Sequence, residues 1–208
     1  MTAPPPQTPP PGERDERPVE IWPAAIVLLV TVALTWPLGS KLSSAIPAYT
    51  RALDEDLLSN IWSVWWARSA LLEGRGSLLF TRYMLHPDGV TLTMSAIAPS
   101  VTAALAPIAG LFPGIAGVFV AWNLNVLATF FLSGLGGYLL TRRVVGSPWA
   151  ALAGGLIFAF SPYRYDHLRH VDLSCTQWLP FVFWTLLGRL EGGGWHWTGR
   201  SGWPGSAR

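Results

Sequence analysis

The amino-acid sequence predicts an all-α fold, namely a polytopic transmembrane helical protein with about four spanning helices and external amphipathic juxtamembrane helices. Two observations lead to this class. Of the 208 residues, 50% are hydrophobic and only 12% are charged, whereas a soluble domain carries about a quarter charged residues to cover its hydrated surface. The hydrophobic residues are also gathered into long blocks, which is typical of segments that cross a bilayer. We therefore expect a multi-pass protein of the cell membrane that contacts membrane lipid.

The apolar blocks define a predicted transmembrane domain over residues 21–190. The expected spans are at about 21–42, 114–140, 147–161 and 173–190. The Pro-rich residues 1–20 and the Gly/Trp-rich residues 191–208 bury too little apolar surface to fold, so both are predicted to be disordered tails. For the first block a cleaved signal peptide is the alternative. We favour an uncleaved anchor, because the preceding tail is not net basic and no clear cleavage site follows the block.

Arginines near the block ends predict the orientation. The charged N-terminal tail and the short loop with Arg142 and Arg143 are expected to be cytoplasmic, because cytoplasmic loops carry an excess of basic residues. The polar loops 43–113 and 161–172 then lie together on the external side. Under this arrangement the Pro-interrupted block 96–112 lies at the membrane interface. If that block crosses the bilayer instead, the two loops lie on opposite sides.

The first external loop contains a predicted surface helix with carboxylates at its start. The side of this helix that is expected to face the membrane carries Leu58, Ile61, Trp62, Trp65, Ser69 and Leu72 at helical spacing. Asp54, Glu55 and Asp56 come directly before it. These carboxylates can simply interact with the helix dipole. Alternatively, one of them at the water–lipid boundary can deprotonate an acceptor hydroxyl or bind a divalent metal ion. The spacing alone leaves both alternatives open.

The second external loop carries a cluster of basic side chains. His167 and His170 are three residues apart, so on a helix they share a face, with Arg164 nearby. Two histidines fall short of the three or four ligands of a zinc site, so no metal site is predicted here. Arg164 and Arg169 can bind a phosphate group. Non-specific contact with lipid headgroups is the alternative.

Several function classes are excluded or not supported. The net charge is only +2 and the basic residues form no stripe, so we expect no nucleic-acid partner. The single cysteine, Cys175, excludes an internal disulfide. His86 and Asp88 lie in a Pro-Asp-Gly run that predicts a turn. A transporter is less favoured than an enzyme, because no charged residue lies within a clear span.

Three stretches, taken in order, resemble one family of membrane enzymes. They are DLLSNIWSVWW from Asp56, LLFTRYMLHPDGVTL, and the long segment from LSGLGGYLL to CTQWLPF. The first has the spacing D-x5-W-x3-W. Together they resemble bacterial polytopic membrane proteins of the glycosyltransferase C superfamily, over roughly residues 21–190. Relatives are usually far longer, so the resemblance implies an N-terminal fragment of such an enzyme that lacks part of the carrier-binding cavity.

The resemblance implies transfer of a sugar from a polyprenyl-phosphate carrier to an acceptor on the outer face of the membrane. Enzymes of that superfamily use an acidic residue of the first external loop as general base, and this role carries over to Asp56, with Asp54 as second choice. The expected substrate-binding residues are Trp62, Arg164, His167 and His170. No cofactor is identified, and a divalent metal ion stays open. The alternative function is a non-catalytic polytopic membrane protein, either a scaffold or a vestigial fragment.

Overall fold

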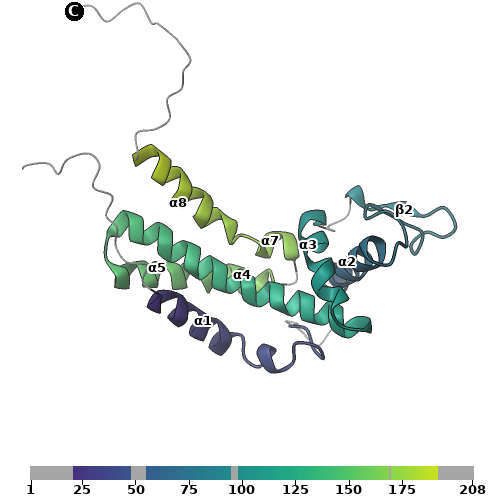
Figure 1. Cartoon of the computed structure of the whole chain (residues 1–208), viewed down its shortest axis with the longest axis horizontal. Coiled ribbons are helices and arrows are strands. Elements are labelled where there is room, and N and C mark those ends of the chain that lie inside the picture. Colours follow the sequence, from purple (N-terminus) through teal and green to yellow (C-terminus); the bar gives the residue numbers. More distant parts are fainter. Residues whose placement is uncertain (1–20, 48–54, 95–97, 169, 192–208) are drawn as a thin grey trace, which may run out of the picture.

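The structure, a computed structural model, describes residues 21–47, 55–94, 98–168 and 170–191 (Figure 1). The predicted all-α class is confirmed, because the described residues form helices with one two-stranded hairpin. The α-helices are α1 (Trp22–Leu34), α2 (Glu55–Leu71), α3 (Pro99–Gly110), α4 (Gly114–Val145), α5 (Pro148–Ala159), α6 (Pro162–Asp166), α7 (Val171–Ser174) and α8 (Trp178–Glu191). The hairpin strands are β1 (Phe80–Thr81) and β2 (Val90–Thr91), and the 3-10 helices are η1 (Leu38–Ser40) and η2 (Leu92–Met94).

Helix α4 is the element on which the others pack. Its 32 residues correspond to about 48 Å at the rise of an α-helix. Helices α1, α5 and α8 lie along its C-terminal half, whereas α2, α3 and the hairpin lie around its N-terminal half (Figure 1). Gly146, with φ +77°, ends α4 in the left-handed conformation that suits glycine. The two halves of α4 therefore have different neighbours.

Small residues let α5 approach α4 closely. A Cβ atom added to Gly155 of α5 would lie 2.5 Å from the Gly134 carbonyl oxygen and 2.8 Å from the Tyr138 amide nitrogen of α4. Gly137 faces Gly155 in the same contact, where an added Cβ would lie 3.0 Å from the Gly155 Cα. Close backbone approach through glycines is the packing mode that transmembrane helices use, because lipid supplies no hydrophobic force between them.

The outer faces of α1, α5 and α8 are apolar and exposed. The exposed side chains on these faces are Leu28, Leu29, Val32, Leu34, Trp149, Ile157, Trp178, Leu179, Val182, Phe183, Leu186 and Leu190. Soluble monomers rarely expose large clusters of apolar side chains. The C-terminal half of α4 is thus flanked by helices whose outward sides are mostly apolar.

One of the described helices, α4, is long and apolar enough to cross a membrane, with a mean hydropathy of 1.8 over its best window. The other three predicted spans contain shorter helices: α1 has 13 residues, α5 has 12 and α8 has 14. Prolines explain part of this difference. Pro37 follows α1, and Pro148 and Pro162 bracket α5; proline removes an amide donor and disfavours helix in the residue before it.

Helix α2 forms where the sequence predicts a surface helix, and its buried side coincides only in part with the predicted stripe. The buried apolar side chains that face α3 and α4 include Leu57, Ile61 and Val64. Of the predicted stripe, Ile61 is buried, whereas Leu58 and Leu72 are 45% and 52% exposed. Apolar residues occur almost all around this helix, so the spacing fits two overlapping faces. Contacts with α3 and α4 select a face that shares Ile61 with the predicted stripe.

The turn predicted at His86 and Asp88 is confirmed, and it lies in a β-hairpin. The residues between β1 and β2 reverse the chain, and the Gly89 amide donates to the Leu85 carbonyl at 2.9 Å. Gly89 has φ +83°, a conformation that glycine adopts without steric cost.

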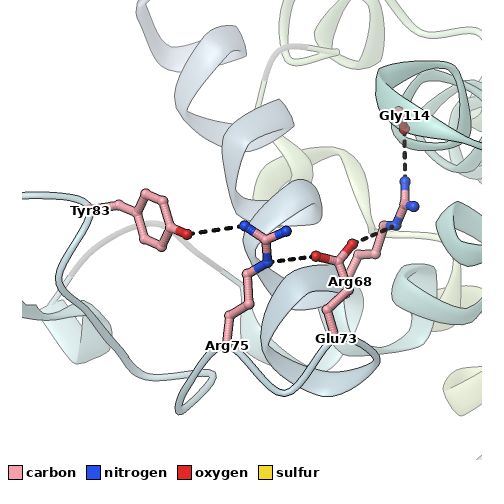
Figure 2. A network of polar contacts seen from close by, with 5 residues as sticks. All are labelled: Arg68, Glu73, Arg75, Tyr83 and Gly114. Atoms are coloured by element: carbon pink, nitrogen blue, oxygen red, sulfur yellow. Dashed lines mark hydrogen bonds and ion pairs between the residues drawn. The ribbon is translucent and has the colours of Figure 1, made fainter.

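A chain of polar contacts ties this hairpin to α2 and to the start of α4 (Figure 2). Arg75 donates to the Tyr83 hydroxyl at 3.1 Å and forms an ion pair with Glu73 at 2.7 Å. Glu73 also pairs with Arg68 at 3.4 Å, and Arg68 donates to the Gly114 carbonyl at 2.7 Å. The hairpin therefore has a fixed position relative to α4.

We predict that Gly155→Ala destabilises the fold by about 1–3 kcal/mol, because the new Cβ meets backbone atoms of α4 that side-chain rotation cannot move away. Unfolding in detergent micelles, followed by circular dichroism, measures this loss. Gly39→Ala is the matched control, since a Cβ there has nothing within 4 Å. Equal stability of the two variants would contradict the close α4–α5 contact.

Candidate functional site

Asp56 and His170, which are far apart in the sequence, lie next to each other in the structure. The distance between His170 Nε2 and Asp56 Oδ2 is 3.8 Å. Asp56 lies in the first turn of α2, and its side chain is 62% exposed. His170 directly precedes α7, and its side chain is 25% exposed. The two external loops predicted from the sequence therefore meet at this pair, which forms an ion pair when His170 is protonated.

His167 extends this site along the second loop. Its ring stacks on Tyr163 at a centroid distance of 4.1 Å and lies 6.1 Å from the His170 ring. Its Nδ1 is 2.8 Å from the Tyr163 carbonyl oxygen. Because a carbonyl oxygen only accepts, Nδ1 must carry the hydrogen, and in the neutral ring Nε2 then carries the lone pair.

Arg164 lies in the interior, whereas the sequence analysis expects it to face a phosphate or sugar. The residue is 3% exposed. Its guanidinium donates to the Thr176 hydroxyl and, at 3.2 Å, to the Thr129 carbonyl of α4. It also lies over the Phe130 ring, 5.4 Å from the centroid. Burial lowers the pKa of Arg164 to about 10, so the side chain remains a cation at neutral pH.

Trp62 lies in an aromatic cluster between α2 and the hairpin. Its ring stacks on Trp66 with centroids 6.0 Å apart and contacts Trp65 at 6.2 Å. Tyr83 of the hairpin contacts both Trp65 and Trp66 at 5.5 Å. Trp62 therefore helps to hold the hairpin on α2. Asp54 and Arg169, the other residues named from the sequence, lie outside the described residues.

A scan against protein families matches residues 72–203 to a domain of unknown function, DUF6311. The chain belongs to the DUF6311 family. The part that matches the DUF6311 model contains the hairpin, α3 to α8 and the residues Arg164, His167 and His170, whereas Asp56 precedes it. No curated protein and no solved structure matches this chain.

The buried Asn123 of α4 holds the segment that follows η1, and sequence reasoning missed it. Asn123 is fully buried, and its Nδ2 donates to the Leu42 carbonyl at 2.8 Å and to the Ala45 carbonyl at 2.7 Å. In the sequence, this segment precedes α2, which carries Asp56. The sequence did contain a signal for this contact, namely a polar residue within an apolar block. Such a group is costly to bury without hydrogen-bond partners, so partners were to be expected.

The described residues contain no group of three or more His, Cys, Asp and Glu side chains that could hold a metal ion. Asp56 and His170 supply two potential ligands, which is fewer than a protein site for a divalent metal normally recruits.

We predict that Asn123→Leu destabilises this DUF6311 chain by about 1–3 kcal/mol, because two carbonyl groups of residues 42 and 45 lose their donor inside the protein. The free energy of unfolding in detergent measures the effect. Leu124→Ala, at a neighbouring exposed position of α4, is the control and should stay within about 0.5 kcal/mol of the parent. A similar small change in Asn123→Leu would show that the two contacts contribute little.

Proposed function

We propose that this chain is a glycosyltransferase-like membrane protein that transfers a sugar from a polyprenyl-phosphate carrier to an extracytoplasmic acceptor. The observation that carries the proposal is the approach of Asp56 to His170 at 3.8 Å. A carboxylate and an imidazole that meet at an accessible surface form a pair suited to proton transfer. The resemblance to the glycosyltransferase C superfamily names the reaction class.

The apolar outer faces of α1, α5 and α8 support a membrane location for the C-terminal half of α4. The glycine contacts between α4 and α5 support the same location. In this proposal, Arg142 and Arg143 mark the cytoplasmic end, in accordance with the bias of basic residues in cytoplasmic loops. Helix α2, helix α3 and the hairpin then form the external part, and four helices cross the bilayer.

In the proposed reaction, Asp56 accepts the proton of the acceptor hydroxyl. The acceptor oxygen forms a bond to the anomeric carbon of the donor sugar while the bond from that carbon to the phosphate oxygen breaks. The electron pair leaves with the polyprenyl phosphate, and the proton remains on the Asp56 carboxylate. Asp56 is suited to this role because it is exposed at the start of α2, where an acceptor can reach it.

His170 lies next to Asp56, and His167 lies beside His170; both rings can offer positive charge or hydrogen-bond donors to a phosphate. Both are partly exposed, at 25% each. Arg164 is buried, so the proposal assigns contact with the leaving phosphate to the two histidines. Charge-assisted donors to a phosphate oxygen are about twice as strong as neutral ones, which favours the protonated rings.

We predict that Asp56→Asn lowers sugar transfer about 10²–10⁴-fold, the usual contribution of a general base. The assay uses membranes that contain the full chain and polyprenyl-phosphate hexoses with a tritium-labelled sugar. Asp88→Asn is the matched control, because Asp88 is an exposed carboxylate in the hairpin turn. Transfer that is equal in the two variants, or absent from the parent with every donor, would count against the proposal and favour a non-catalytic membrane protein.

The proposed topology predicts which cysteines react from outside the cell. In a chain with Cys175 replaced by Ser, a cysteine at Ser59 or at Ser161 should react with an impermeant maleimide in intact cells. A cysteine at Val145, which is 56% exposed beside Arg142 and Arg143, should react only after permeabilisation. If the cysteine at Ser59 or at Ser161 failed to react with the maleimide in intact cells, the candidate site would lie on the wrong side of the membrane for an extracytoplasmic acceptor.

A further inference from the structure

The loop between α5 and α8 is closed by one buried side chain. Arg164, near its start, donates to the Thr176 hydroxyl near its end and to the Thr129 carbonyl of α4. Phe130 of α4 lies beneath the guanidinium and packs against Phe160 at 5.3 Å and Tyr165 at 5.2 Å. The guanidinium thus joins both ends of the loop to a single turn of α4.

The energetics of burial make this contact a strong positional constraint. A charged group that leaves water is strongly destabilising unless hydrogen bonds compensate it, so the loop is held where the guanidinium finds its acceptors. Arg164 keeps its contacts with the Thr129 carbonyl and the Phe130 ring only while the loop lies against α4. A displaced loop would lose these two contacts and keep only the one within the loop, with the Thr176 hydroxyl.

A chain of backbone hydrogen bonds carries this constraint to His170. The His167 amide donates to the Tyr163 carbonyl at 3.1 Å, and the His170 amide donates to the His167 carbonyl at 3.0 Å. The Ser174 amide then donates to the His170 carbonyl at 2.9 Å. His170 therefore lies within a hydrogen-bonded segment whose two ends are both held by Arg164.

We propose that Arg164 is a positioning residue, which holds the second loop on α4 so that His170 faces Asp56. Only the catalytic role of the Asp56–His170 pair rests on the proposed function. The positioning of the loop by Arg164 does not depend on it. It differs from the role of a phosphate ligand, because Arg164 acts here without contact with a substrate.

The test measures the approach of the two loops without an activity assay. Cysteines replace Asp56 and His170 in the full chain, with Cys175 replaced by Ser, and a protease site is placed in the exposed hairpin loop. A short bis-methanethiosulfonate reagent is added to native membranes, and the protease then cuts the chain between the cysteines. The two fragments migrate together only in crosslinked molecules.

We expect rapid crosslinking in the parent and a rate that is roughly tenfold lower in Arg164→Met, because the effective concentration of the second thiol falls when the loop is released. Arg164→Lys and Thr176→Val should give intermediate rates, since each keeps part of the contact. Arg189→Met, at an exposed position of α8, should leave the rate unchanged. Leu152→Ala, which removes a buried side chain between α4 and α5, should lower the melting temperature without a change in rate.

Crosslinking of Arg164→Met at the parent rate would overturn the proposal. If that variant does not accumulate, an unchanged rate in both Arg164→Lys and Thr176→Val would overturn it as well. A slow rate in Leu152→Ala would have the same effect, because it would show that general loss of stability explains the result. The outcome is independent of sugar transfer: an inactive parent chain with Arg164-dependent crosslinking would remove the proposed function and keep Arg164 as the residue that positions the loop.

Discussion

Two buried polar side chains, Asn123 of α4 and Arg164 of α6, must find their hydrogen-bond partners inside the protein. An unpaired buried donor costs about 1–3 kcal/mol, and more when it is charged. Asn123 takes its acceptors from the segment after η1, and Arg164 takes one of its acceptors from the far end of the second loop. Each contact fixes one loop on the same helix, so α4 sets the relative position of the two loops.

The two halves of α4 serve this arrangement in different ways. The C-terminal half packs closely, through glycines, against helices whose outer sides are mostly apolar. The N-terminal half packs against α2 and α3 through a mixed apolar core. The Arg68–Glu73–Arg75 contacts hold the hairpin on this half as well. Because one continuous helix runs through both halves, the position of the candidate site relative to the bundle is fixed by helix geometry.

The sequence predicted where the longer helices lie and a turn at the Pro-Asp-Gly run, because apolar blocks and turn residues act locally, but it predicted α1, α5 and α8 to be longer than they are. It also singled out Asp56 and His170, whose proximity depends on how the two loops pack on α4. It could not show that Arg164 turns inward, because an arginine near two histidines has the same pattern at a surface as in an interior. The sequence also could not predict the full buried face of α2, because apolar residues surround that helix. Only the positions of α3 and α4 select one side.

The separation of the exposed pair from the buried cation bears on how an anionic carrier would be recognised. A phosphate that approaches Asp56 meets a like charge, so a positive partner is needed close to it. Arg164 is fixed by acceptors in the interior, and a turn toward the surface would break the contacts that hold the loop. In the proposed function, the positive charge beside Asp56 would come from His170 and from His167, whose ring lies next to that of His170. The two proposals thus give position to the arginine and charge to the histidines, and substitution can separate the two contributions.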